Sequence, residues 1–269
     1  MKSVKFGFIG PGKMAGAIIN GIFSADYTKK ENVFIYGRGQ ARKDYFASLG
    51  CTVCENIKDM VESCPIIFLA VKPQNFPEIY ELLAPYKDKD ILYVSIAAGI
   101  TFKNMQENLG MDKKFIRVMP NTPMLLGAGA SAMCKTDNVS ESEYLIIKDI
   151  LSTSGSVYDI REEDINAVIA VSGSSPAYIY LIAKCIADFG ADHGLERDTA
   201  LKLFADTLVG SAKMLTETGN SEDEQTEMVS SKGGTTVAAT TVLKNSEFFP
   251  LLTKAMDACV KRAEELSGK

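Results

Sequence analysis

The sequence predicts an α/β fold, a doubly wound parallel sheet followed by an all-helical domain. Over roughly the first 160 residues, short apolar runs alternate with helical patterns, which is typical of a parallel sheet covered by helices. From about residue 161 the strand pattern stops, and helical patterns continue almost to the end of the chain. We therefore expect two domains, at residues 1–160 and 161–269.

The strands of the first domain are expected where apolar and β-branched residues cluster. They are residues 4–9, 33–36, 66–70, 91–96 and 115–119, with helices at 14–23, 42–48 and 76–83 between them. Two later strands, at 130–134 and 156–159, bracket a helical pattern at 141–151. We expect this later pair to extend the same sheet.

The helical domain is expected to contain helices at 177–191, 199–215, 222–229, 236–243 and 249–266. Ser174, Ser175 and Pro176 predict the start of the first of these, because a hydroxyl caps a helix and proline fits its first position. Gly194 predicts its end. His193, the only histidine, is placed where an imidazole meets the last turn favourably, which predicts capping rather than catalysis.

The helix at 177–191 is apolar on nearly all sides, as a deeply buried helix is. A helical domain of roughly 110 residues is too small to bury such a helix by itself. The sequence therefore predicts a partner subunit, in a homodimer or a larger assembly built on dimers.

Composition excludes some classes of protein. The formal net charge of −5 argues against a nucleic-acid surface, which needs clustered positive charge. Glycines and a proline interrupt the first apolar run too early for a secretory signal, and we find no apolar run long enough to span a membrane. The expected location is the cytoplasm, with a small-molecule substrate and with neither a membrane nor a nucleic acid as partner.

The six cysteines are expected to be structural. Cys51 and Cys54 form a C-x-x-C, but the residues between them read as strand, and no second pair or neighbouring histidine completes a zinc set. Others, such as Cys185, lie in apolar runs where a thiol behaves as a small buried hydrophobe. No metal site is predicted.

A dinucleotide fingerprint, G-x-G-x-x-A, follows the first expected strand. Gly10 permits the tight turn, Gly12 lets the backbone approach a pyrophosphate, and Ala15 allows the next helix to pack closely on the strand. The N-terminus of that helix supplies N–H groups and the positive end of its dipole. The expected cofactor contacts here are Ile9, Gly10, Pro11, Gly12, Lys13 and Met14.

The end of the second strand indicates which nicotinamide cofactor binds. A carboxylate there binds the ribose of NAD, whereas an arginine accommodates the 2′-phosphate of NADP. The chain has Arg38, with Arg42 and Lys43 close behind and no acid, which favours NADPH; a solvated basic turn is the alternative.

Two later segments end strands with small residues, and in a parallel sheet ligands bind beyond the carboxyl ends of the strands. Pro73 stops its strand and frees nearby carbonyls. Ordinary strand-ending turns explain either segment equally well when it is taken alone. The further candidate cofactor contacts are Asn56, Ala70, Val71, Lys72, Pro73, Ala97, Ala98 and Gly99.

A loop in the helical domain, residues 229–239, combines two glycines and several hydroxyls with the start of a helix. Glycines expose bare N–H groups, Thr235 or Thr236 is expected to cap, and the helix dipole favours a carboxylate. A plain loop with a capped helix is an equally good interpretation of the spacing alone.

Segments spread along nearly the whole chain resemble pyrroline-5-carboxylate reductases. The segments are the fingerprint, residues 70–73, 97–99, 117–123, 172–178 and 231–236, of which the last three in this order are specific to the family. The resemblance implies a Rossmann-like domain followed by a helical dimerisation domain, NAD(P)H as hydride donor and proline as product. The chain departs from the family at Lys232, where proline is usual, at Ser175, where glycine is usual, and at Met228, where some relatives have a polar residue facing the substrate.

The resemblance also gives the candidate site residues their roles. The substrate carboxylate is expected on the N–H groups of Gly233, Gly234 and Thr235, with the hydroxyl of Thr236 on the ring nitrogen. Ser231 is expected to orient the loop or touch the substrate. Family analogy adds Glu162 near the substrate.

Two alternatives remain. One is another imine or hydroxyacid reductase on the same scaffold; β-hydroxyacid dehydrogenases carry a catalytic lysine near the start of the first interdomain helix, where this chain has Ser174–Tyr178 and Lys184 only two turns later. The other is a non-catalytic NADPH-sensing protein, which needs no Gly-Gly-Thr-Thr loop.

Overall fold

The computed structural model describes residues 4–267. The chain forms two compact units: a sheet unit, Met1–Ser174 with Cys259–Lys269, and a helical unit, Ser175–Ala258. The helical unit begins after the expected division at residue 160, and the last residues of the chain return to the sheet unit. These two units are defined by contacts between residues. The division expected at residue 160 is one into functional domains, and it stays a prediction.

The sheet unit contains one eight-stranded sheet among the described residues, in the order β3-β2-β1-β4-β5-β6-β7-β8. The strands are β1 (Phe6–Ile9), β2 (Val33–Tyr36), β3 (Thr52–Val53), β4 (Ile66–Leu69), β5 (Leu92–Ser95), β6 (Lys114–Met119), β7 (Gly129–Lys135) and β8 (Gly155–Asp159). All pairs are parallel except β6 with β7. The predicted doubly wound sheet is confirmed, and the later strand pair extends it as expected.

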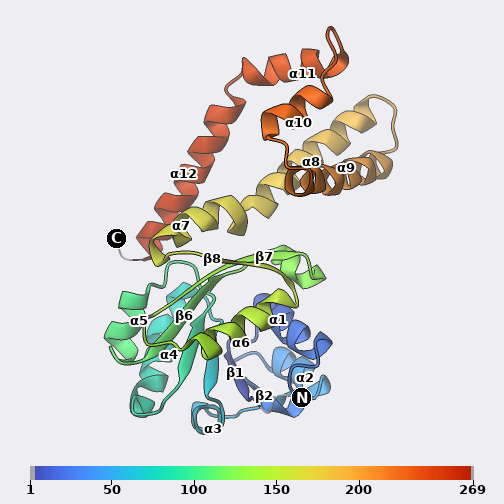
Figure 1. The fold of residues 1–269 in the computed structure, drawn as a ribbon. Helices are drawn as coiled ribbons and strands as arrows, with labels where there is room; N and C mark the ends of the chain where they lie inside the picture. The colour runs from blue at the N-terminus through green and yellow to red at the C-terminus, as the bar shows by residue number, and fades with distance from the viewer. Residues whose placement is uncertain (1–3, 268–269) are drawn as a thin grey trace. The chain divides into compact units, whose positions relative to one another are not determined.

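Helices cover both faces of this sheet (Figure 1). One face carries α1 (Lys13–Ser24), α2 (Gln40–Ser48) and α6 (Glu141–Ser152); the other carries α3 (Ile57–Ser63), α4 (Phe76–Leu83) and α5 (Phe102–Leu109). Each face has its own apolar core, because neighbouring side chains on a strand point to opposite sides. In β1, for example, Phe8 joins one core and Ile9 the other.

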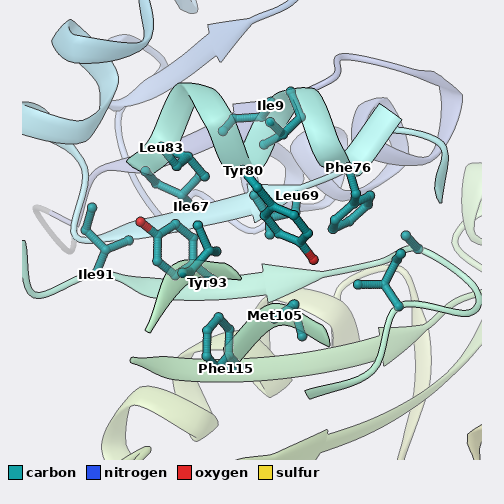
Figure 2. Close-up of a cluster of buried hydrophobic side chains, with 14 of the residues drawn as sticks. Ile9, Ile67, Leu69, Phe76, Tyr80, Leu83, Ile91, Tyr93, Met105 and Phe115 are labelled. Carbon is teal, nitrogen blue, oxygen red and sulfur yellow. The ribbon is translucent and has the colours of Figure 1, made fainter. Parts of the chain in front are cut away.

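The core beneath α4 is shown in Figure 2. Phe76, Tyr80 and Leu83 of this helix are buried against apolar side chains of the strands, Ile67 and Leu69 among them. The Phe76 and Tyr80 rings meet edge to face, with centroids 5.6 Å apart. Several buried aromatic and aliphatic anchors, each worth about 1.5–3 kcal/mol, fix α4 against the sheet.

The helical unit is built from α8 (Ser175–Asp192), α9 (Arg197–Glu217), α10 (Glu222–Met228), α11 (Thr235–Lys244) and most of α12 (Phe248–Leu266). All five helices that the sequence predicts here are present, each within two residues of its expected ends. The last turns of α12 belong to the sheet unit, where Ala263 is buried in the core below α5.

The first of these helices, α8, begins at Ser175, within the predicted start at Ser174–Pro176, but it does not begin from a loop. The chain is already helical before Ser174, through α7 (Ile165–Val168) and a π-turn at Ile169–Gly173, in which the Ser174 N–H donates to the Ile169 carbonyl at 2.8 Å. Pro176 has no N–H for the Ser172 carbonyl, and the side chain of Asn121 donates to that oxygen at 3.4 Å instead. A π-turn therefore precedes α8 and its proline.

Joining these segments also overturns the expectation that no apolar run is long enough for a membrane. The helical stretch Glu162–Asp192 has 31 residues and, by length and composition alone, is apolar enough to cross one. Its apolar side chains are largely exposed in the single chain; Tyr180, Leu181 and Phe189 are each more than 60% exposed. Cys185 is also exposed, against the expectation of a buried thiol.

The end of α8 and the C-x-x-C agree with the sequence. Gly194 adopts φ +89°, and the ring Nδ1 of His193 lies 2.9 Å from the Phe189 carbonyl, so the imidazole bonds the last turn as predicted. Cys51 and Cys54 are buried, and burial raises the pKa of each thiol to about 11. Within residues 4–267 no cluster of metal-ligating side chains occurs.

Candidate functional site

The glycine turn follows β1 and is held by neighbouring backbone. The Gly10 N–H donates to the Tyr36 carbonyl at 2.9 Å, and the Gly12 N–H donates to the Gly10 carbonyl at 2.7 Å. Gly10 adopts φ +90°, and a Cβ there would lie 2.6 Å from a methyl carbon of Val71. Both the backbone conformation and the packing therefore require glycine at position 10.

Gly12 has a different reason to be glycine. Its φ of −80° suits any residue, and a Cβ there would meet nothing closer than the Gly10 carbonyl oxygen at 3.9 Å. No protein atom excludes a side chain, so the bare backbone at the N-cap of α1 is left open for a ligand. Ala15, one turn into α1, is buried as the fingerprint requires.

A cavity of about 270 Å³ lies at the carboxyl ends of β1, β2 and β4. β1 stands between β2 and β4, so the chain crosses over in opposite directions from it and leaves a crevice there. Seven predicted cofactor residues line the cavity: Ile9, Gly10, Pro11, Gly12, Arg38, Ala70 and Val71. The structure therefore brings together the ends of three strands that are far apart in the sequence.

The basic residues after β2 divide into two groups. Arg38 lines the cavity and forms an ion pair with Glu78 of α4. Arg42 instead donates from Nε to the Pro11 carbonyl and from Nη2 to the Gly12 carbonyl, each at 2.8 Å, and Lys43 pairs with Glu55 at 3.3 Å. Arg42 therefore fixes the glycine turn, and of the three only Arg38 remains for a phosphate.

The remaining predicted cofactor residues lie outside the cavity lining. They are Lys13 and Met14 in the first turn of α1, Asn56 after β3, Lys72 and Pro73 after β4, and Ala97, Ala98 and Gly99 after β5. The Asn56 side chain caps α3, accepting from the Asp59 N–H at 3.0 Å. A Cβ on Gly99 would lie 2.7 Å from the Cβ of Leu266, so packing against α12 already explains this glycine.

Glu162 is engaged within the sheet unit. One carboxylate oxygen accepts from the Arg117 guanidinium at 2.6 Å and from the Phe102 N–H, the first of α5, also at 2.6 Å. The Arg117 side chain is only 4% exposed, whereas that of Glu162 is 33% exposed. Glu162 thus neutralises a buried charge and completes a helix N-terminus, and its predicted contact with substrate stays a prediction.

The second glycine turn precedes α11 in the helical unit. Gly233 adopts φ +73°, and the Gly234 N–H donates to the Ser231 carbonyl at 2.9 Å. The turn itself uses this N–H, and its predicted contact with a substrate carboxylate stays a prediction. The N-cap is Gly234, without a side-chain hydrogen bond, so the predicted cap by Thr235 or Thr236 is wrong.

The other groups of this turn remain open to a ligand. First-turn N–H groups of α11, including that of Thr235, have no partner within their own helix. Thr236 is half-buried, and its hydroxyl makes no hydrogen bond with the described part of the chain. A Cβ on Gly234 would lie 2.5 Å from the Ser231 hydroxyl oxygen, so glycine at this position lets Ser231 pack against the turn.

Comparison with known proteins identifies the family of this chain. Residues 162–266 match the family model for pyrroline-5-carboxylate reductase dimerisation, and the reductase of Pisum sativum is 37% identical over 98% of this chain and 97% of its own length. The chain belongs to the pyrroline-5-carboxylate reductase family. The enzyme of Escherichia coli K12 is 35% identical over 98% of each chain.

A solved structure supports the same assignment. The pyrroline carboxylate reductase of Plasmodium falciparum, solved with NADP bound, has a TM-score of 0.89 and 29% identity and covers 99% of both chains. Residues 5–99, which hold the first glycine turn, match a model described as NADP oxidoreductase coenzyme F420-dependent. The predicted fold class, a Rossmann-like sheet with a helical dimerisation domain, is confirmed.

The three departures from the family lie in different surroundings. Lys232 is exposed in the second turn and has no ion pair among residues 4–267; Met228, at the end of α10, is exposed too. Ser175 opens α8, directly after the π-turn.

Sequence reasoning missed several cavity residues. They are Tyr36, Gly37, Asn75, Glu78, Ile79 and Leu82. Gly37 could have been found from the sequence, because it is a glycine directly after a strand. In the structure, a Cβ at this position would lie 2.4 Å from the ring of Pro11. Glu78 could not have been found in this way, because its place opposite Arg38 depends on how α4 packs on the sheet.

Proposed function

We propose that the chain reduces 1-pyrroline-5-carboxylate to L-proline, with NADPH as the preferred hydride donor. The observation that carries this proposal is Gly12, whose missing side chain has no packing reason and leaves the helix N-terminus bare beside the cavity. Membership of the reductase family supplies the substrate. A cytoplasmic location fits six free cysteines, and the substrate is a small molecule rather than a nucleic acid.

The residues at the cavity fit the proposed cofactor. The first-turn N–H groups of α1 suit a pyrophosphate, with the turn fixed by Arg42, while Arg38 suits a 2′-phosphate. When bound, the nicotinamide supplies the hydride. The small residues Ala97 and Ala98 leave room beyond β5, and Asn56, Lys72 and Pro73 stay candidate contacts by family resemblance.

The second turn is proposed to hold the substrate. The substrate carboxylate would accept hydrogen bonds from the N–H groups of Gly233 and Thr235. The Gly234 N–H is used by the turn. The hydroxyl of Thr236 would hydrogen-bond to the ring nitrogen of the substrate, and Ser231 would support the turn. Hydrogen bonds to a charged carboxylate in such a place are worth about 1.5–3 kcal/mol each.

This chemistry asks little of the protein as an acid or base. The imine nitrogen is itself basic, so a proton from water already makes the neighbouring carbon electrophilic. The chain has to bind the substrate and orient it toward the hydride donor. Most of the rate gain from proximity arises from this positioning. His193 is bonded to its own helix and takes no part.

The exposed apolar surface of α8 favours a homodimer. Tyr180, Leu181 and Phe189 lie within residues 162–266, which match the dimerisation model. Subunit packing would remove these side chains from water, at about 25 cal/mol for each Å² of apolar area. We expect sedimentation at micromolar concentration to give a dimer or a multiple of dimers. A single monomeric species would contradict this proposal.

The assay that tests the function follows NADPH absorbance with pyrroline-5-carboxylate, and then with hydroxyacids or ketoacids in its place. We expect turnover with the imine and none with the oxygen analogues. Turnover only with a ketoacid would favour a different reductase. Tight NADPH binding without turnover of any substrate would favour a sensing protein.

Replacing Thr236 with alanine tests the role of its hydroxyl. We expect kcat/KM to fall by about 5- to 150-fold, corresponding to about 1–3 kcal/mol, while turnover persists because positioning remains. Thr241→Ala is the matched control, since the Thr241 hydroxyl on the same helix donates only to the Val237 carbonyl. Equal activity of Thr236→Ala and the control would exclude the role.

A further inference from the structure

An acidic side chain reaches the cofactor cavity from the helix opposite β2. Glu78 lies in the first turn of α4 and lines the cavity together with Arg38, which follows β2. The two side chains form an ion pair, and both keep contact with solvent, with 47% of the Glu78 side chain and 71% of the Arg38 side chain exposed. The cavity wall therefore carries one positive and one negative charge, each partnered by the other.

The position of Glu78 is fixed by the helix that carries it. Phe76 and Tyr80 on the same helix are buried in the core below (Figure 2). Ile79, beside Glu78, is buried as well and lines the cavity. Because these anchors hold α4 in place, Glu78 can leave the cavity only by changing its own rotamer.

The carboxylate of Glu78 lies where dehydrogenases distinguish their cofactors. The end of β2 faces the ribose 2′-position, and an acid there accepts a hydrogen bond from the 2′-hydroxyl of NAD. Here β2 is followed by Gly37 and Arg38, and the acid comes instead from α4 on the other side of the cavity. A 2′-phosphate would be attracted by Arg38 and repelled by Glu78.

We propose that Glu78 is a specificity-determining residue that lowers the preference of this chain for NADPH over NADH. The inference rests on the proposed binding of a nicotinamide dinucleotide in this cavity. When NADPH binds, Arg38 exchanges the carboxylate of Glu78 for the phosphate, which carries the larger charge. When NADH binds, the ion pair persists and Glu78 accepts from the ribose.

The charge pair also makes the effects of the two residues depend on each other. With Glu78 present, Arg38 must give up its ion pair before it binds the phosphate, whereas with glutamine at position 78 it has no ion pair to break. Arg38→Gln therefore weakens NADPH binding less when Glu78 is present than when position 78 is glutamine. Such non-additivity is expected when two interacting side chains act on the same group of a ligand.

The test is a fluorescence titration of the full chain with NADPH and with NADH, for the wild type, Glu78→Gln, Arg38→Gln and the double variant. Glu78→Gln is expected to lower the Kd for NADPH about fivefold, the repulsion of two unit charges about 4 Å apart in water. The Kd for NADH is expected to change less than twofold, because an amide oxygen still accepts from a hydroxyl. At about 1 M salt, where screening acts over roughly 3 Å, the gain for NADPH shrinks.

Glu81→Gln is the matched control, with the same change of charge at an exposed position of the same helix but outside the cavity lining. It is expected to keep the wild-type ratio of the two Kd values. An unchanged ratio in Glu78→Gln, or equal weakening of both cofactors, would overturn the inference. If the wild type binds neither cofactor, the inference and the proposed function both fail. If it binds them but reduces no imine, the titration still decides the role of Glu78.

Discussion

Gly10→Ala is expected to weaken NADPH binding and to lower kcat/KM with NADPH roughly a hundredfold, the loss of rate that a misplacement of about 1 Å can produce. Gly10 adopts φ +90°, where a Cβ costs roughly 1–2 kcal/mol. That Cβ would also lie 2.6 Å from Val71 and 2.9 Å from the Ala70 carbonyl oxygen. The turn must shift to relieve these contacts, and the N–H groups at the start of α1 shift with it.

The measurements are the Kd for NADPH from fluorescence titration and kcat/KM with NADPH, together with the melting temperature and the far-ultraviolet circular dichroism. Gly39→Ala is the matched control, because Gly39 adopts φ −83° and a Cβ there meets nothing within 4 Å. The control is expected to bind NADPH like the wild type. A folded Gly10→Ala protein that binds NADPH with wild-type affinity would show that the turn does not hold the cofactor.

The first glycine turn was predictable from sequence because its signals are local. Gly10, Gly12 and Ala15 have fixed spacing between a strand and a helix, and each does what that spacing requires. Arg38 follows β2 directly, so its place at the cavity depends only on the parallel pairing of β1 with β2. Local pattern and sheet topology together were enough.

Other features depend on tertiary contacts that leave no local mark. The antiparallel direction of β7 is one, because alternation along a strand is the same in either direction. The pairing of Arg42 with the glycine turn is another, since nothing in the residue type separates it from Arg38. The π-turn before Ser174 was hidden by a serine and proline pattern that ordinarily starts a helix.

Glu162 shows how a residue can be found by resemblance and yet have a second role that only coordinates reveal. Its carboxylate accepts from the buried Arg117 guanidinium and from the first N–H of α5. Three acidic residues in a row follow β8, and nothing in the sequence shows which of them pairs with Arg117, 45 residues earlier in the chain. Glu162 therefore has two possible roles, substrate contact and structural support. The two roles predict different effects of a substitution on KM and on stability.

Glu162→Ala is expected to lower the free energy of unfolding by about 3 kcal/mol, measured by chemical denaturation at a fixed protomer concentration. Removing this carboxylate leaves the Arg117 charge, whose side chain is 4% exposed, without its partner in the sheet unit. Partial exposure of Glu162 places the expected loss at the low end of the range for buried pairs.

Glu163→Ala is the matched control for this prediction, because Glu163 pairs with Arg161 at the surface, where both side chains are largely exposed. Its effect is expected to stay within about 0.5 kcal/mol. If structural support is the main role of Glu162, the substrate KM of the folded Glu162→Ala protein stays near that of the control. Wild-type stability with a raised KM would instead assign Glu162 to the substrate, and the Arg117 pair would then contribute little to the fold.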